Sequence, residues 1–281
     1  MISRQSQYII WAVDEMDKIV KKDSVEVLYS VEGSGSGLLL IHGTGATHQL
    51  WEELSHTLSA QFTVMSPNYG QLGANLRLEL DDVVEQHLAV ASQEGFEQFH
   101  VIGYSLGAEI AAALAAKYPM RVQSLTLIAG WVESDVSVHF QFDLWHKLLK
   151  SDRTAFAQFL MHTGYSSDYL NQYAIHELLA MTDDLAQNLA PEMNHHIELD
   201  TRINLRPLLG NITAPTLVIG LTHDRMVPVE QTKELAALIS GSQYREIASG
   251  HLIVTENGVA LLEELLLFLA QVDERLRSVL R

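Results

Sequence analysis

The 281 residues of this chain are enough to bury a large core without disulfides or metal ions, and 47% hydrophobic and 19% charged residues are typical of a globular protein. The absence of cysteine excludes disulfides, thiolate metal sites and a cysteine nucleophile. The 35 acidic against 18 basic residues give a formal net charge of −17, which would repel phosphate backbones, so we expect no nucleic-acid partner.

The N-terminal residues hold the candidate targeting segment. The apolar run from Tyr8 to Val13 is short and leads directly into acidic residues, unlike a signal peptide, and no run approaches the roughly 18 apolar residues of a membrane span. We therefore expect a cytoplasmic protein without a transmembrane segment. Apolar residues at helical spacing predict an amphipathic helical extension over residues 1–23. Its apolar face would pack on the main domain, and a homodimer contact or a membrane surface are the alternatives.

Strand-like and helical stretches then alternate along the chain. Alternating apolar residues predict a strand at residues 24–31, and short apolar runs predict further strands at residues 38–41, 62–66, 100–102 and 124–128. Helical stretches separate these runs, at about residues 49–60, 80–95 and 106–118. The alternation predicts an α/β fold with a mostly parallel central sheet and helices on both faces.

Strand-like runs stop over residues 131–207, where helical spacings and aromatic residues dominate. We expect an inserted helical cap there, and we expect Trp131 and Trp145 to contact the substrate. Sheet character returns at residues 216–219 and 243–247, with a helix at 229–240 between them and a final helix from about residue 257. Residues 24–130 and 208–281 would therefore form the core domain.

Residues 103–107 read Gly-Tyr-Ser-Leu-Gly and match the pattern G-x-S-x-G. Three common residues at fixed spacing recur by chance in roughly one chain in ten, so the context matters. A strand-like run leads directly into the motif and an Ala-rich helical stretch leads directly out, as this serine turn requires. Side chains at Gly103 and Gly107 would collide with neighbouring backbone in such a tight turn. Ser105 is the candidate nucleophile, and the amide of Leu106 is a candidate oxyanion donor.

With these features the chain resembles the α/β-hydrolase superfamily, specifically its capped serine esterase and acyl-hydrolase branch, over about residues 24–281. Residues 40–45 read Leu-Ile-His-Gly-Thr-Gly and are similar to the turn that supplies the second oxyanion donor in that family. The resemblance assigns this role to the backbone of Thr44. We also expect His42, Gly43 and Tyr104 to contact the substrate.

The family order of serine, acid and histidine can also be met. Asp224 lies in a segment that resembles the family's G-x(3)-D-x(3)-P turn, and His251 lies in a similar Gly-His turn after a strand. The resemblance implies that His251 accepts the proton of the serine and that Asp224 orients the imidazole. Some members place the acid after the preceding core strand, which here would mean Glu133 or Asp135.

Two further features concern the substrate and metals. Family members commonly carry an Asp-x-x-Gly-x-Gly loop after the fourth strand, whereas residues 67–73 have Asn68 and Gln71 in place of the charged residues, which weakens any transfer of substrate type. His195 and His196 are adjacent and point apart on a helix, and no H-E-x-x-H spacing occurs. We therefore expect neither a metal site nor a cofactor.

These residues together predict a serine hydrolase. It would cleave a carboxylic ester, thioester or lactone of a small, largely apolar acyl substrate through an acyl-enzyme. Acyl transfer and carbon–carbon bond hydrolysis use the same triad and stay open as alternatives. A ligand-binding module that keeps the fold without turnover is the non-enzymatic alternative.

Overall fold

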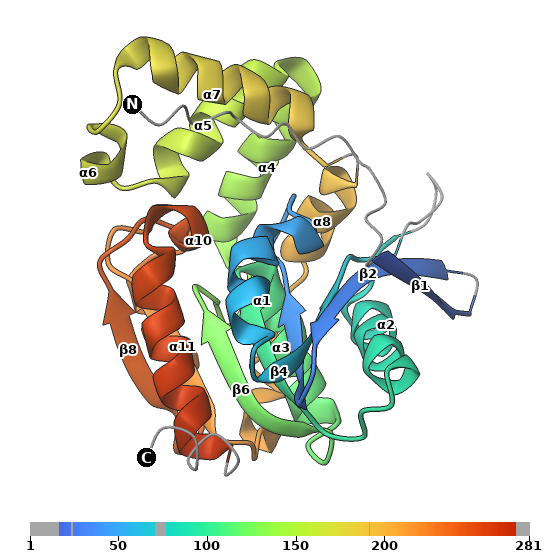
Figure 1. The fold of residues 1–281 in the computed structure, drawn as a ribbon. Coiled ribbons are helices and arrows are strands. Elements are labelled where there is room, and N and C mark those ends of the chain that lie inside the picture. The colour runs from blue at the N-terminus through green and yellow to red at the C-terminus, as the bar shows by residue number, and fades with distance from the viewer. Residues whose placement is uncertain (1–16, 24, 71–76, 191, 274–281) are drawn as a thin grey trace.

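The computed structural model describes residues 17–23, 25–70, 77–190 and 192–273. One eight-stranded sheet runs through the molecule in the order β1-β2-β4-β3-β5-β6-β7-β8 (Figure 1). The strands are β1 (Asp17–Lys22), β2 (Val25–Gly33), β3 (Ser36–Ile41), β4 (Phe62–Pro67), β5 (Phe99–Tyr104), β6 (Val122–Ile128), β7 (Thr216–Leu221) and β8 (Gln243–Ile247). The pairs β1–β2 and β2–β4 are antiparallel, and all other neighbours are parallel. The predicted mostly parallel sheet is confirmed.

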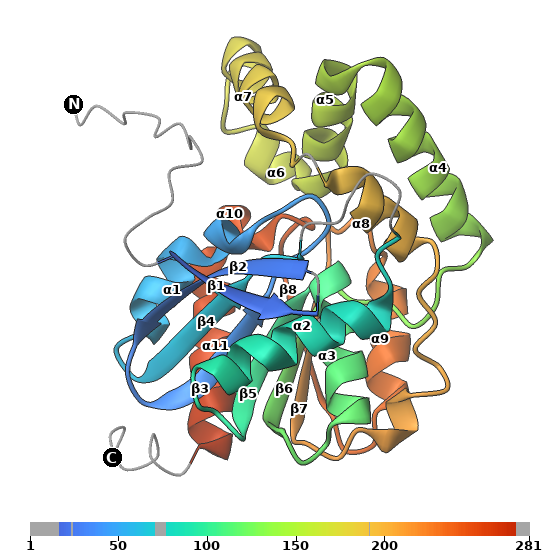
Figure 2. The same ribbon diagram turned by 90° about the vertical axis from the view of Figure 1, so that its right-hand side faces the viewer.

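Helices cover both faces of this sheet, as Figure 2 shows. One face carries α2 (Leu80–Gln93), α3 (Leu106–Lys117) and α9 (Val229–Leu238), and the other carries α1 (Glu52–Leu58) and α11 (Gly258–Val272). The shorter helices are η1 (His48–Trp51), η2 (Leu209–Asn211) and α10 (Ile253–Glu256). Buried side chains alternate along the central strands: Leu39 and Ile41 join one hydrophobic cluster, and Leu38 and Leu40 join the other. Two cores, one on each face, therefore fix the sheet between the helices.

The predicted N-terminal helix is wrong in the part that the structure describes, because Asp17–Lys22 forms the edge strand β1. Its backbone pairs with β2, for example Lys18 with Tyr29 and Val20 with Val27. Val20 is the one buried side chain of β1, so a helix at Asp17–Lys22 would have little apolar surface to bury. Pairing with β2 instead gives the backbone amides and carbonyls of β1 hydrogen-bond partners. Residues 1–16, with the partner contacts predicted for them, lie outside the described residues.

Helices replace strands between β6 and β7. This segment forms α4 (Val136–Ser151), α5 (Arg153–Gly164), α6 (Ser167–Leu170), α7 (Ile175–Asn188) and α8 (Met193–Asp200), named here the inserted helices. Asp135 and Asp152 cap the first two of them by accepting hydrogen bonds from backbone amides. The inserted helices lie together at one end of the sheet (Figure 1). No helix in the described part of the chain has the length and hydropathy to cross a bilayer.

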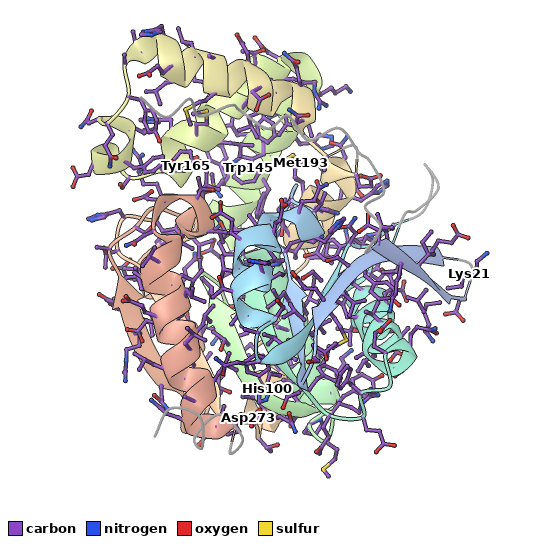
Figure 3. The ribbon with its side chains drawn as sticks, in the orientation of Figure 1. Lys21, His100, Trp145, Tyr165, Met193 and Asp273 are labelled. Atoms are coloured by element: carbon purple, nitrogen blue, oxygen red, sulfur yellow. The ribbon has the colours of Figure 1, made fainter. Side chains whose placement is uncertain are left out.

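The two ends of the molecule differ in character. Trp145, Tyr165 and Met193 lie where the inserted helices meet the sheet (Figure 3). At the opposite end His100 and Asp273 approach each other, with 3.4 Å between Nε2 and Oδ2, and Ser36 donates a hydrogen bond to the same carboxylate. This buried polar cluster links the C-terminal end of α11 to strands β3 and β5, at the end of the molecule opposite the inserted helices.

Candidate active site

Ser105 occupies a strained turn between β5 and α3. Its backbone has φ 54° and ψ −129°, a conformation that costs a non-glycine residue about 1–3 kcal/mol and persists where the surroundings enforce it. A Cβ at Gly103 would overlap the carbonyl oxygen of Gly107, and one at Gly107 would overlap the carbonyl oxygens of Ile41 and His42. The close approach of these backbones explains both glycines of the motif. It sets Ser105 at the carboxyl end of the sheet.

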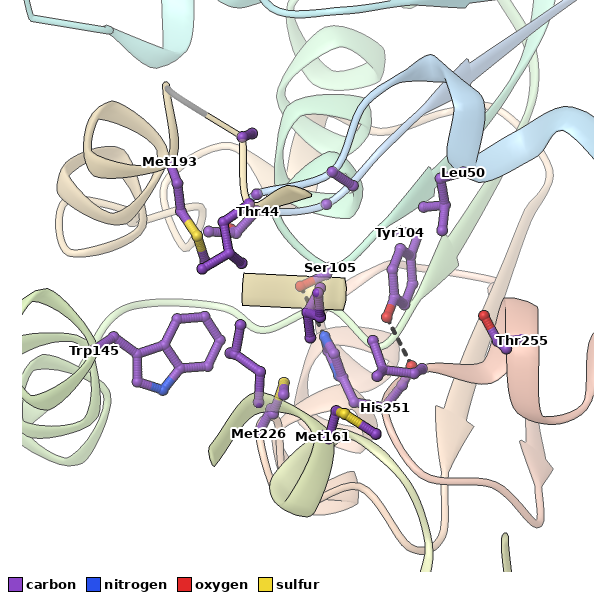
Figure 4. A pocket seen from close by; sticks show the side chains of 18 of the residues that line it. Thr44, Leu50, Tyr104, Ser105, Trp145, Met161, Met193, Met226, His251 and Thr255 are labelled. Carbon is purple, nitrogen blue, oxygen red and sulfur yellow. Dashed lines mark hydrogen bonds between the residues drawn. The ribbon is translucent and has the colours of Figure 1, made fainter. Parts of the chain in front are cut away.

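Ser105, His251 and Asp224 form one hydrogen-bonded chain. The Nε2 atom of His251 lies 3.0 Å from Oγ of Ser105, and its Nδ1 lies 2.6 Å from Oδ2 of Asp224. Figure 4 shows the imidazole directly beneath the serine. The side chain of Asp224 has no exposed surface, and its Oδ1 accepts the amides of Met226 and Val227 at 2.7 and 2.8 Å. The carboxylate is thus fixed, and Nδ1 donates to it, which leaves Nε2 free to accept the serine proton.

The alternative acids are engaged elsewhere. Asp135 accepts a hydrogen bond from the amide of Val138 at the start of α4, and Glu133 pairs with Arg206 at 3.1 Å. Asp224 is the carboxylate that the structure brings to His251.

Tyr104 has a contact that the sequence did not reveal. It lines the cavity, its hydroxyl donates a 2.8 Å hydrogen bond to the carbonyl oxygen of His251, and the two rings lie 5.2 Å apart. Burial raises the pKa of Tyr104 well above its usual value, so the phenol stays protonated and able to donate. Tyr104 therefore holds the backbone of the histidine in place.

The turn at residues 43–45, named here the oxyanion turn, lies against the serine. A Cβ at Gly43 would be 2.9 Å from Cβ of Ser105, so glycine allows the backbone to approach this closely. Gly43 and Thr44 line the cavity, and Leu106 begins α3 directly after the serine. Two candidate amide donors thus flank Ser105 on separate segments.

His42 lies beneath the oxyanion turn and does not belong to the cavity lining. Its ring stacks on Tyr69 at 4.2 Å, and its Nδ1 lies 2.9 Å from the carbonyl oxygen of Gly43. Burial lowers the pKa of His42 well below 6.5, so the imidazole is neutral. The expectation that His42 contacts substrate is not met, because the ring is buried under the turn. Asn68 accepts a hydrogen bond from the amide of His48, and Gln71 lies outside the described residues.

A cavity of about 520 Å³ opens above Ser105, between the oxyanion turn and the inserted helices. Trp131 and Trp145 are among the residues that line it, and their contact with a substrate stays a prediction. Eleven further lining side chains are large and apolar: Leu50, Phe142, Leu160, Met161, Met181, Leu185, Leu189, Met193, Met226, Val227 and Leu252. Asp184 is the acidic residue among the described residues that line the cavity, and this lining contains no lysine or arginine. The arrangement suits an apolar ligand without a negative charge.

Two buried groups on α8 were missed by the sequence reasoning. Asp200 has no exposed surface and His196 is buried as well, and both contact the oxyanion turn. The sequence signal that could have indicated them is their spacing of four residues, which places both on one face of a helix. This spacing is also typical of residues that only pack in a core. Over the described ranges no group of three or more possible ligands could hold a metal ion, so His195 and His196 form no such site there.

Known proteins resemble this chain in sequence and in structure. The sequence profile of the alpha/beta hydrolase fold family matches residues 38–258. Pyrrolizixenacetamide deacetylase of Xenorhabdus hominickii is 33% identical over 245 residues, which cover 85% of this chain and 92% of that protein. Pimeloyl-[acyl-carrier protein] methyl ester esterase of Edwardsiella ictaluri is 28% identical over 207 residues, which cover 68% and 76%. The enol-lactonase of Burkholderia xenovorans shares the fold with a TM-score of 0.79 at 21% identity, covering 90% and 100%.

Proposed function

We propose that this chain, which belongs to the alpha/beta hydrolase fold family and has relatives named as hydrolases, is a serine hydrolase that cleaves a small, largely apolar ester, thioester or lactone. The observation that carries the proposal is the chain of two hydrogen bonds from Ser105 through His251 to Asp224 at the floor of the cavity. A serine hydroxyl is a poor nucleophile when protonated, and this arrangement supplies the base and fixes its tautomer.

The reaction follows from these positions. Oγ of Ser105 attacks the acyl carbon while His251 takes the hydroxyl proton, and the amides of Thr44 and Leu106 stabilise the negative charge on the acyl oxygen. His251 then returns the proton to the leaving group, which departs and leaves an acyl-enzyme. A water molecule repeats the sequence with His251 as base, and the acid is released with Ser105 restored.

We assign the role of a cap over the site to residues 131–207, which contain the inserted helices. Their side chains, including Trp145 and Met161, form much of the cavity wall that faces Ser105 (Figure 4). Such an apolar wall excludes water from the reacting carbonyl and favours an acyl chain or ring over a sugar or phosphate. Acyl transfer, carbon–carbon bond hydrolysis and binding without turnover use the same site and are outcomes of the tests below. The cytoplasmic location and the homodimer stay predictions.

A second candidate is the hydrolysis of an N-acetyl amide. The 33% identical relative from Xenorhabdus hominickii is named a deacetylase, and it matches this chain over 85% of its length. An amine is a poor leaving group unless it is protonated as it departs, and His251 is placed to donate that proton. The same triad thus supports either reaction.

The experiment compares matched substrates. Neutral 4-nitrophenyl esters with acyl chains from acetyl to octanoyl, together with 4-nitroacetanilide, are given to the native enzyme and to Ser105→Ala. We expect turnover that depends on Ser105, and a KM that falls as the chain lengthens because more apolar surface is buried. Cleavage of the acetanilide at a rate near that of the acetate ester would favour the deacetylase. Turnover that survives in Ser105→Ala, or no turnover of any compound by folded protein, would contradict the proposal.

A further inference from the structure

One face of α8 covers the oxyanion turn. Met193, His196 and Asp200 follow each other at spacings of three and four residues, so they lie along one side of the helix, and all three are buried. A Cβ at Gly45 would lie 2.9 Å from Cε of Met193, and Figure 4 shows the Met193 side chain beside Thr44. The last inserted helix therefore packs directly on the segment that carries a proposed oxyanion donor.

Two hydrogen bonds fix the turn to this face. The hydroxyl of Thr44 donates to Oδ2 of Asp200 at 2.7 Å, and the amide of Gly45 donates to Nδ1 of His196 at 3.1 Å. An imidazole whose Nδ1 accepts a hydrogen bond is neutral and carries its hydrogen on Nε2. Both partners of the turn thus come from α8, more than 150 residues away in the chain.

Burial favours the uncharged forms of Asp200 and His196, which suit an oxyanion site. Burial raises the pKa of Asp200 well above its usual value, and burial lowers the pKa of His196 to about 3. Asp200 keeps one oxygen, Oδ1, buried and without a partner among the described residues, where a protonated carboxyl costs less than an ionised one. A neutral Asp200 can accept the Thr44 hydrogen bond and adds no negative charge beside a developing oxyanion.

A further set of hydrogen bonds holds the end of α8 itself. The hydroxyl of Ser134 donates to the carbonyl oxygen of Asp200, and Nε1 of Trp131 donates to that hydroxyl at 3.0 Å. The amide of Trp131 in turn donates to Oε1 of Glu109 on α3, the helix that starts at the nucleophile. The α8 face is thus connected to both sides of Ser105.

We propose that Asp200 and His196 are positioning residues that hold the oxyanion turn through Thr44 and Gly45, so that the inserted helices set the geometry of oxyanion stabilisation. The proposal rests on the proposed function for its catalytic consequence. Oxyanion donors act only when they are aimed at the charge that develops, and a misplacement of about 1 Å can cost about 10²-fold in rate. Loss of either contact should therefore lower kcat and leave ground-state binding largely intact.

The kinetic test uses a set of variants with a neutral ester. We expect Asp200→Ala to lower kcat by about 10- to 100-fold with KM changed less than about threefold, and Asp200→Asn, which keeps the acceptor, to restore most of the rate. Thr44→Val should show the same loss, and the double variant with Asp200→Ala no further loss, because both changes break one contact. Glu198→Ala, on the exposed side of α8, is the matched control. A rise in KM at constant kcat, or additive losses, would overturn the proposal.

A second measurement does not depend on turnover. Hydrogen exchange of the amides at residues 43–46 should be faster in Asp200→Ala and in His196→Leu than in the native protein or Glu198→Ala, because the turn is released. Unchanged exchange in both variants would refute positioning by α8. Faster exchange in an enzyme whose turnover does not need Ser105 would refute the proposed function and leave the structural role of α8 standing. If Asp200→Ala does not fold, Thr44→Val and Asp200→Asn still decide between the outcomes.

Discussion

The imidazole Nε2 of His251 lies 3.0 Å from Oγ of Ser105, although 146 residues separate the two in the chain. The meeting follows from the sheet, because Ser105 follows β5 and His251 follows β8, and parallel strands place their carboxyl ends at one edge. Asp224 joins them from the turn after β7. The sheet thus fixes the starting points of the three turns that carry Ser105, Asp224 and His251.

The identity of the acid can be decided by removing one charge. Asp224→Asn should lower kcat by about 10³- to 10⁴-fold, because the amide no longer fixes the tautomer that leaves Nε2 free to accept the serine proton. The matched control is Asp135→Asn, whose side chain can still cap α4. Steady-state kinetics with one neutral ester measure both. A larger loss in Asp135→Asn than in Asp224→Asn would mean that the acid has been assigned to the wrong strand.

The serine turn should not tolerate a side chain at Gly107. Gly107→Ala would push a Cβ into the backbone of β3, so we expect a Tm at least about 5 °C lower, or no soluble protein. Gly258 at the start of α11 has no atom within 4 Å of such a Cβ, so Gly258→Ala should be neutral or slightly stabilising. Thermal unfolding followed by circular dichroism compares the two. Equal Tm values would show that the close approach at Gly107 is not required.

The charge of the cavity should select among substrates. Asp184 lines the cavity and its neighbour Asp183 is exposed outside it, so the two offer a matched pair. We expect Asp184→Lys to raise kcat/KM for an ester with a terminal carboxylate by about tenfold, which corresponds to about 1.4 kcal/mol of interaction with the new cation. Asp183→Lys should change this ratio little once salt screens the surface. The same gain in both variants would point to net charge instead of a contact in the cavity.

Acid should destabilise the protein through buried histidines such as His87. Its ring has no exposed surface, and burial lowers its pKa to about 4. The unfolded chain binds a proton near pH 6.5 and the folded chain near pH 4, so the free energy of unfolding falls as pH drops through this window, by about 1.4 kcal/mol per pH unit for this group. In His87→Leu the slope from pH 6 to 4.5 should be shallower by about that amount.

Urea unfolding at several pH values measures this slope, with the exposed His139→Leu as control. An unchanged slope in His87→Leu would mean that His87 is protonated in the folded protein as readily as in the unfolded chain.

The fold and the Ser105 turn were predictable because their signals are local. The glycines at 103 and 107, the strand before them and the helix after them lie within one stretch of the sequence, and the turns around Asp224 and His251 are equally short. The edge strand β1 was mispredicted as helix because its pairing with β2 does not show in apolar spacing. Local signals thus pointed to the candidate triad and missed a strand that is defined by its pairing with a neighbour.

The contact between Thr44 and Asp200 could not be predicted. The two residues are 156 apart in the chain, and nothing near either one indicates the other. His42 and Tyr104 show the same limit, since packing decides that one ring lies beneath the oxyanion turn and that the hydroxyl of the other holds the backbone of His251. Roles that depend on which segments pack together required the structure.

The most direct test of an activated serine is intact-mass analysis after treatment with a fluorophosphonate. The native protein should gain the mass of one phosphonyl group, and Ser105→Ala and His251→Ala should gain none, while Ser151→Ala at an exposed position should label like the native chain. Circular dichroism shows that each variant is folded. An adduct that persists in Ser105→Ala, or no adduct on the folded native protein, would contradict the assignment of Ser105 as the nucleophile.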